Sequence, residues 1–144
     1  DSLKYTTPGG KTVYGGGGIM PDIFVPVDTS LYTNYYMQVR NKGLLYRFAL
    51  KYADKNRGNL DQFKDYREMV EYLDNQDLLG QFITFAEENG LKESNEEIIL
   101  SQHVLLVSMK AFIARFILDN EGYYPIIHQI DPTIQKSLEI FAQK

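Results

Sequence analysis

The β-like segment at the N-terminus constrains this fold most, because the rest of the chain offers no strands to pair with it. Residues 3–7 (LKYTT) and 11–14 (KTVY) are short β-like runs, separated by a turn at residues 8–10 (PGG). Residues 23–27 (IFVPV) predict a further strand, at a sheet edge or strand end because Pro26 lacks an N–H. Two or three such strands are not stable alone in water, so this segment needs partners.

Four consecutive glycines, residues 15–18, interrupt the same segment. Glycine loses more conformational freedom on folding than any other residue, so the run indicates a close backbone approach or a positive φ. A phosphate-binding loop is the alternative, but the signature GxxxxGK[ST] is absent and no helix is expected directly after Gly18. We therefore interpret the glycines as a close approach or a bulge within a sheet.

From residue 29 onward the pattern changes to helical periodicity, as at Leu45, Phe48 and Tyr52. Residues 61–73, with Phe63, Tyr66 and Val70, form the least regular of these segments. The predicted helices lie within residues 31–40, 44–56, 61–73, 78–90, 95–120 and 133–144. The sequence therefore predicts a mainly α fold, with five to six helices after a short β fragment.

The expected helix ends rest on capping residues. The predicted N-caps are Thr29 or Ser30, Asn75 or Asp77, Ser94 in a capping box with Glu97, and Asp131 before Pro132. The predicted stops are Gly43, residues 57–59, Gly90 and Gly122. The helix between Ser94 and Gly122 is apolar around much of its circumference, so we expect it to be the central, most buried helix.

Charge and composition exclude some classes of function. Lys and Arg number 15 against 19 Asp and Glu, and this net charge of −4 argues against nucleic acid as a partner. Acidic residues concentrate in residues 61–97, which we interpret as solvated helix faces, with a surface for cations or a basic partner as the alternative. There is no cysteine, and no run of 18 apolar residues, so we expect no transmembrane segment.

No arrangement of residues typical of catalysis or metal binding emerges. His103 and His128 are the only histidines, and without HExxH spacing or cysteine partners we interpret His103 as a core or boundary residue. The serine motifs GxSxG and SxxK are absent, and Ser108 and Lys110, two apart on a helix, do not face each other. We therefore predict no catalytic, cofactor-binding or metal-binding residue, and no cofactor.

The opening stretch, LKYTTPGGKTVYGGGGIMPDIFV, resembles the end of the catalytic core in carboxy-terminal processing peptidases, also called tail-specific proteases. In that family a TPxGR turn between strands is followed by a glycine-containing link and a Gly-Ile-x-Pro-Asp element. The matching positions are Thr7, Pro8, Gly10, Lys11, Gly18, Ile19, Pro21 and Asp22. The glycine-rich form, together with LLYRFALKYAD and KAFIARFILDNEGYYPI further on, is similar to the Bacteroidetes branch, so the resemblance spans essentially the whole chain.

The resemblance implies two parts: residues 1–28 as the terminal strands of a peptidase core, and residues 29–144 as a helical C-terminal domain. The family's catalytic serine and lysine lie upstream of this segment, and no position here matches their motifs. The chain would then be a non-catalytic fragment, inactive alone. The intact serine peptidase would act in the cell envelope, in the periplasm, on proteins or peptides with apolar C-terminal tails.

The alternative hypothesis is a free-standing helical protein-interaction module, with amphipathic helices, aromatic faces and an acidic belt. Strand pairing at residues 11–28 discriminates between the two, because such a module has no need of it. An unpaired β edge attracts a partner strand. We therefore expect residues 1–28 to pair with a second copy of the chain, forming a homo-oligomer, or to fold back on the helices.

Overall fold

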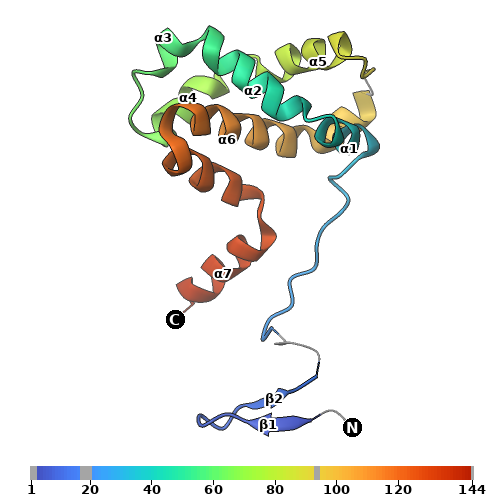
Figure 1. Cartoon of the computed structure of the whole chain (residues 1–144), viewed down its shortest axis with the longest axis vertical. Helices are drawn as coiled ribbons and strands as arrows, with labels where there is room; N and C mark the ends of the chain where they lie inside the picture. The colour runs from blue at the N-terminus through green and yellow to red at the C-terminus, as the bar shows by residue number, and fades with distance from the viewer. Residues whose placement is uncertain (1–2, 17–20, 93–94, 144) are drawn as a thin grey trace.

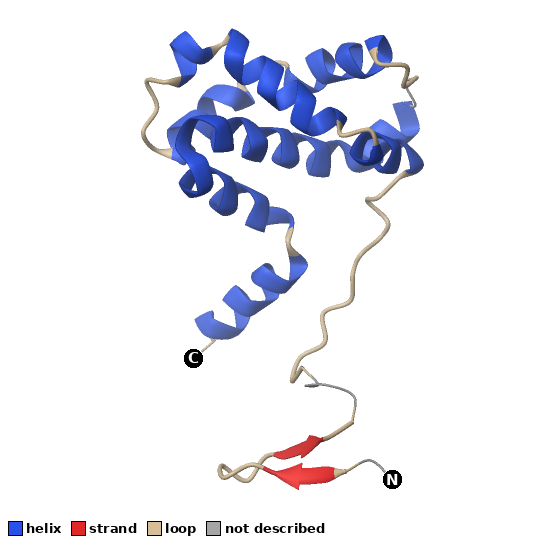
Figure 2. Ribbon diagram, in the orientation of Figure 1, coloured by secondary structure: helices blue, strands red, loops and turns tan. Residues whose placement is uncertain are grey.

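A computed structural model describes residues 3–16, 21–92 and 95–143, and it consists of a helical unit preceded by a two-stranded hairpin (Figures 1 and 2). The elements are β1 (Lys4–Thr6), β2 (Thr12–Tyr14), α1 (Asn34–Asn41), α2 (Leu44–Lys55), α3 (Arg57–Leu60), α4 (Tyr66–Asp74), α5 (Leu78–Glu88), α6 (Asn95–Ile127), the 3₁₀ turn η1 (His128–Ile130) and α7 (Pro132–Ala142). The predicted mainly α fold with a short β fragment is confirmed. The described part has seven α-helices rather than five or six, because α3 is a separate turn.

The hairpin confirms the first two predicted strands. β1 and β2 pair antiparallel, with Tyr5 opposite Val13, and the hairpin lies apart from the helices in Figure 1. The predicted strand at residues 23–27 is wrong, because that segment is irregular and has no neighbouring strand. Pro26 also lacks the N–H that a ladder would use. The hairpin does not fold back on the helices, and pairing with a second copy stays a prediction.

The first helix begins later than predicted. The N-cap of α1 is Thr33, whose hydroxyl accepts a hydrogen bond from the Tyr36 N–H at 3.2 Å, so neither Thr29 nor Ser30 caps it. Gly43 separates α1 from α2 as expected, in a left-handed conformation with φ of 63°. A glycine adopts this conformation without the steric cost that a Cβ would add.

The helix α2 packs against α6 along its apolar face. Leu45, Phe48, Ala49, Tyr52 and Ala53 are all buried, which confirms the predicted periodicity. The helix ends at Lys55 with Asn56 as its C-cap. The helix therefore ends just before residues 57–59, as predicted, and these residues themselves belong to the single turn of α3.

The helices α4 and α5 each begin at an aspartate. The Asp65 carboxylate accepts a hydrogen bond from the Arg67 N–H at 2.7 Å, and the Asp77 carboxylate accepts one from the Gly80 N–H at 3.0 Å. Asp77 is thus the cap of α5, and Asn75 is not. Gly90, with φ of 77°, follows α5 as expected. The structure therefore resolves the irregular segment 61–73 into a loop and a short helix.

The long helix α6 lies at the centre and contacts α1, α2, α4 and α5, as predicted. Its buried side chains are Ile98, Ser101, Val104, Leu105, Val107, Ser108, Met109, Ala111, Ile113, Ala114 and Ile126. The predicted capping box at its start involves Ser94, which lies outside the described residues. The Glu97 carboxylate instead accepts the Tyr35 N–H at 2.6 Å, and so it bonds an amide in the first turn of α1, where the helix itself supplies no acceptor.

A sharp kink at Asp119 divides α6. Asp119 has φ of 53° and ψ of −141°, the one described residue other than glycine with a positive φ. Gly122 does not close the helix as predicted. It is buried three residues after the kink, where a Cβ would lie 2.8 Å from the Ala114 carbonyl oxygen. Gly122 thus allows the second segment of α6 to fold closely against the first, and that segment continues through Pro125.

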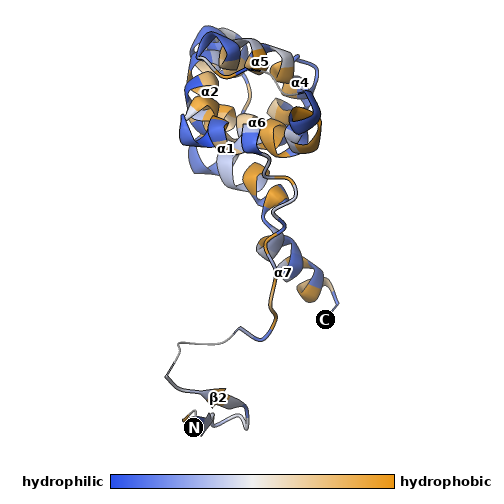
Figure 3. Cartoon of the chain, turned by 90° about the vertical axis from the view of Figure 1, so that its right-hand side faces the viewer, coloured by the Kyte–Doolittle hydropathy of each residue, from blue (hydrophilic) through white to orange (hydrophobic). Residues whose placement is uncertain are grey.

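The helix α7 begins at the predicted cap. The Asp131 carboxylate accepts hydrogen bonds from the N–H groups of Thr133 at 2.9 Å and Ile134 at 3.1 Å, and Pro132 occupies the first helical position. In Figure 3, α7 extends away from the helical unit and carries both hydrophobic and hydrophilic positions. Leu138 and Phe141 are exposed on it.

The segment Asn95–Ile130 is long and apolar enough to cross a membrane, by length and composition alone. However, 56% of its most apolar window is buried within the protein, and the core helix of a soluble protein meets the same criterion. The expectation that the chain has no transmembrane segment stays a prediction.

The close approach at Gly122 predicts that Gly122→Ala lowers the free energy of unfolding by about 1–3 kcal/mol, because the new methyl group meets fixed backbone. The matched control is Gly58→Ala in α3, where a Cβ has no neighbour within 4 Å. That substitution should raise the free energy of unfolding by about 0.5–1 kcal/mol. Urea denaturation followed by circular dichroism measures both, and equal stabilities would contradict the close approach.

The backbone at Asp119 predicts a preference for glycine. Asp119→Gly should be more stable than Asp119→Ala by about 1 kcal/mol, because alanine keeps the Cβ that is strained at positive φ. At Asn120, which is exposed and helical, the same pair of substitutions should give the opposite order by about 1 kcal/mol. If alanine is the more stable residue at both positions, the kink is not as the structure describes it.

Candidate functional site

The first half of the family motif forms the hairpin turn. The Thr7 N–H donates to the Lys11 carbonyl oxygen at 2.8 Å, and the Gly10 N–H donates to the Thr7 carbonyl oxygen at 2.9 Å. The Thr7 hydroxyl accepts the Lys11 N–H at 3.1 Å, and Gly10 has φ of 81°. Pro8 lies within this turn. The turn thus uses the threonine side chain and the glycine for local geometry.

The second half of the motif approaches the first through an ion pair. The Lys11 ammonium pairs with the Asp22 carboxylate, and Pro21 directly precedes that carboxylate in the chain. Both charged side chains are more than half exposed, so the pair contributes about 0–1 kcal/mol. Gly18 and Ile19 lie outside the described residues. The motif residues that the structure describes therefore gather at the hairpin and its exit.

Two of the four glycines have a visible structural reason. The Gly15 N–H donates to the Leu3 carbonyl oxygen at 2.7 Å, and a Cβ on Gly15 would lie 2.9 Å from Cε2 of Tyr5. Gly16 has φ of 100°. A close approach and a positive φ therefore both occur, as the sequence indicates. Gly17 and Gly18 lie outside the described residues.

The hairpin leaves its outer edges open. In an antiparallel ladder, residue pairs that bond each other alternate with pairs whose backbone N–H and C=O groups point away from the partner strand. Starting from the bonds at Thr7 and Gly15, we infer that the amides of Thr12 and Tyr14 point to the outer edge of β2. All strand residues are exposed, and Tyr5 and Tyr14 expose 54% and 55% of their surface. An open edge with exposed aromatic side chains is a template for a further strand.

The segment after the hairpin also exposes large apolar side chains. Ile23 is 47% exposed, Phe24 is 80% exposed and Val27 is 69% exposed. This segment runs from the hairpin to α1 in Figure 1. Single exposed apolar residues are ordinary, but a contiguous series together with an open strand edge marks an interaction surface. The N-terminal segment is therefore a candidate interface.

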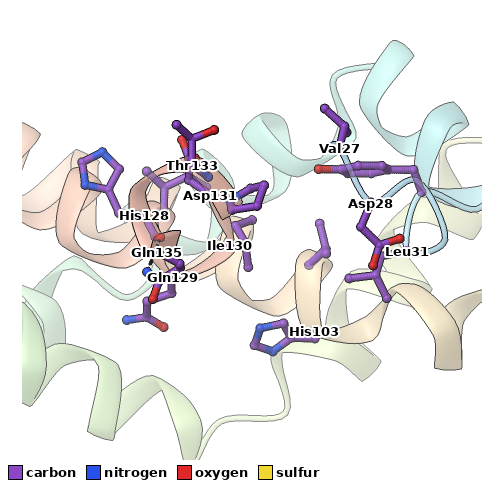
Figure 4. Close-up of a pocket in the computed structure, with 14 residues that line it drawn as sticks. Val27, Asp28, Leu31, His103, His128, Gln129, Ile130, Asp131, Thr133 and Gln135 are labelled. Atoms are coloured by element: carbon purple, nitrogen blue, oxygen red, sulfur yellow. Dashed lines mark hydrogen bonds between the residues drawn. The ribbon is translucent and has the colours of Figure 1, made fainter. Parts of the chain in front are cut away.

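A cleft of about 640 Å³ lies where the segment before α1 meets α6, η1 and α7. Its lining residues are Val27, Asp28, Leu31, Tyr32, His103, Val104, Ile127, His128, Gln129, Ile130, Asp131, Pro132, Thr133 and Gln135. Both histidines line it, but Figure 4 shows their rings apart, on different elements. His103 is exposed, so its interpretation as a core or boundary residue is wrong, and the tilted rings of His128 and Tyr124 have centroids 5.5 Å apart. Within the described ranges, no three His, Asp or Glu side chains converge to hold a metal ion.

The polar groups of the cleft serve local structure. Gln135 donates its side-chain amide to the His128 carbonyl oxygen at 2.8 Å, and Asp131 caps α7. A hydrogen bond from the Ser30 side chain contributes most to lowering the pKa of the Asp28 carboxyl, and a hydrogen bond from the Ser30 backbone contributes less. The Asp28 side chain is therefore a charged, turn-forming residue. Sequence reasoning missed this cleft, because its walls are brought together by the kink at Asp119, which has no clear local signal.

The buried hydroxyl groups lie away from the cleft and within the helical packing. Ser101 donates to the Glu97 carbonyl oxygen at 2.7 Å, and Lys110 pairs with Asp74 rather than with Ser108. Burial raises the pKa of the Tyr36 phenol, with a smaller contribution from the neighbouring Tyr32. These groups stabilise helix contacts, so the structure brings no serine and lysine together in the described part of the chain.

Comparison with curated proteins and with solved structures finds no match. A family model matches residues 35–119. The matched range begins in α1 and ends at the kink residue Asp119, so it contains most of α1, all of α2 to α5 and the part of α6 before the kink, and it leaves out the hairpin motif and α7. Because this match covers more than half of the chain, the chain belongs to the family of unknown function DUF8443.

Proposed function

We propose that this chain is the non-catalytic C-terminal part of a tail-specific serine peptidase. In this proposal residues 1–28 complete a β-sheet of the peptidase core, and residues 29–144 form an appended helical domain. The catalytic serine and lysine belong to a preceding segment of the parent protein. The parent hydrolyses peptide bonds of proteins with apolar C-terminal tails, in the cell envelope. The observation that carries the proposal is the hairpin motif, which forms paired strands whose outer edges are open.

The hairpin is poorly suited to stand alone. A two-stranded sheet is marginal in water, and three or more strands or a packed helix are needed for independent stability. Neither strand has a buried residue, and Tyr5 and Tyr14 present apolar surface to solvent. A neighbouring strand from the peptidase core would bond the free amides of Thr12 and Tyr14 and cover these rings.

The helical domain has a hydrophobic core of its own. All of its buried apolar residues lie between Tyr35 and Ile126, in one cluster centred on α6. The domain therefore needs nothing from the hairpin, which favours a supporting or assembly role beside the peptidase core. The same observation also favours the second candidate function, a free-standing helical interaction module, if the hairpin has no sheet to join.

The test compares residues 1–144 with a longer chain, extended at its N-terminus along the same reading frame. The longer chain should cleave a fluorogenic peptide that ends in an apolar, free C-terminus, whereas residues 1–144 should not. Hydrogen exchange should show the amides of Thr12 and Tyr14 protected only in the longer chain. This protection follows from new hydrogen bonds across the open edge.

Charge at the edge provides a matched pair of variants. Tyr14→Asp should leave the thermal unfolding of residues 1–144 unchanged. It should abolish cleavage by the longer chain, because the new carboxylate would replace an apolar ring in the sheet of the peptidase core. Ile99→Asp, at a residue of α6 that is 64% exposed, is the control and should leave both unchanged. An upstream frame without a serine and a lysine, or edge amides that exchange equally fast in both chains, would refute the peptidase proposal and leave the interaction module.

A further inference from the structure

A row of cationic side chains runs along one side of α2. Arg47, Lys51 and Lys55 follow one another at four-residue spacing, which places them on successive turns about 6 Å apart. All three are exposed. The chain as a whole has a net charge of −4, so this row is a local exception to an acidic surface.

A groove with an aromatic floor lies beside this row, between α2 and α5. The groove has a volume of about 260 Å³ and is lined by Phe48, Lys51, Tyr52, Lys55, Gln81, Thr84, Phe85 and Glu88. A second hollow of about 600 Å³ continues past Lys51 and Phe85 toward Arg47 and Asn89. Burial raises the pKa of the Tyr52 phenol, and the nearby Tyr72 raises it by a smaller amount. The aromatic floor of the groove is therefore uncharged at neutral pH.

Two of the three cations lie over the ring of Phe85. The Arg47 guanidinium lies 5.9 Å from the centre of this ring, and the Lys51 ammonium lies 5.5 Å from it. Such contacts are attractive because the face of the ring is electronegative. They orient the positive charges along the edge of the groove without neutralising them.

No acidic side chain in the described part of the chain forms an ion pair with Arg47, Lys51 or Lys55. Arg47 donates instead to the neutral amide oxygen of Asn89 at 2.8 Å. Asp54, the nearest acid along α2, pairs with Arg57 at 3.2 Å. The three positive charges therefore remain available to a ligand of opposite charge.

We propose that this groove binds an acidic, amphipathic segment of a partner protein. The apolar side chains of the segment occupy the space over Phe48, Tyr52 and Phe85. Its carboxylates pair with the cations of α2, and acids four residues apart on a partner helix match their spacing. This site lies within residues 35–119, so the inference goes beyond the proposed function and does not depend on it.

A protein partner fits the groove better than a nucleic acid. The carboxylate of Glu88 lines both hollows and would repel a continuous run of phosphates. A peptide can avoid this repulsion by presenting an uncharged side chain there. The neutral Gln81 and Thr84 on the α5 side add no positive charge to neutralise a phosphate backbone.

The test is fluorescence anisotropy with a labelled 16-residue helical peptide, acetylated and amidated so that its ends carry no charge. Its leucines recur every three or four residues, and glutamates flank them. A saturable rise is expected, and the affinity should fall at least tenfold when the glutamates are replaced by glutamine. Added salt should also weaken binding, because it screens the charge pairs.

Variants of the chain locate the site. The double reversal Lys51→Glu and Lys55→Glu should lower the affinity at least tenfold, whereas Glu88→Gln should raise it about twofold to threefold. The control is the double reversal Lys64→Glu and Lys136→Glu, which changes the net charge equally at exposed residues outside the groove and should bind as the unmodified chain does. Circular dichroism confirms that each variant is folded.

Three results would overturn the proposal. The first is no saturable binding of the acidic peptide up to millimolar concentration. The second is equal loss of affinity in the groove variant and in the control variant, which would indicate attraction to overall charge alone. The third is tighter binding of single-stranded DNA of matched charge than of the peptide, which would make the row a phosphate-binding surface.

Discussion

The burial of α6 is the interaction on which the rest of the structure depends. Four helices, α1, α2, α4 and α5, pack against it, and each buries an apolar stripe that would otherwise face water. Because all of these contacts converge on one helix, the domain has a single core rather than separate helix pairs. The Glu97 carboxylate adds a polar contact at one end of this core, where it binds the Tyr35 N–H.

The sequence predicted the fold correctly where a residue's local role, such as a helix cap, a positive φ or a place on an apolar face, does not depend on distant parts of the chain. Gly43 and Gly90 adopt positive φ, Asp77 and Asp131 cap helices, and the apolar face of α2 is buried. Prediction failed where tertiary contacts decide the outcome. Gly122 was expected to end a helix, but its lack of a side chain serves packing against Ala114. Residues 23–27 resemble a strand, but among the residues that the structure describes no strand lies beside them to pair with them.

The candidate sites differ in how far the sequence could reveal them. The hairpin turn is local, so Thr7, Gly10 and Lys11 could be identified from their order in the chain. The row of Arg47, Lys51 and Lys55 is visible as a four-residue repeat, but its value as a site appears only once α5 supplies Phe85. The cleft at η1 could not be predicted, because its walls come from three separate segments of the chain, residues 27–32, 103–104 and 127–135.

The kink at Asp119 has a mechanical consequence for that cleft. His103 and Val104 precede the kink and the wall from Ile127 to Gln135 follows it, so the change of direction at Asp119 places these two walls of the cleft opposite each other. The helix α7 has 11 residues and is therefore about 16 Å long. Ile126 is buried and Gly122 packs closely against Ala114, so the segment after the kink is held against the core. The direction that the chain takes at Asp119 therefore sets the position of α7 relative to that core.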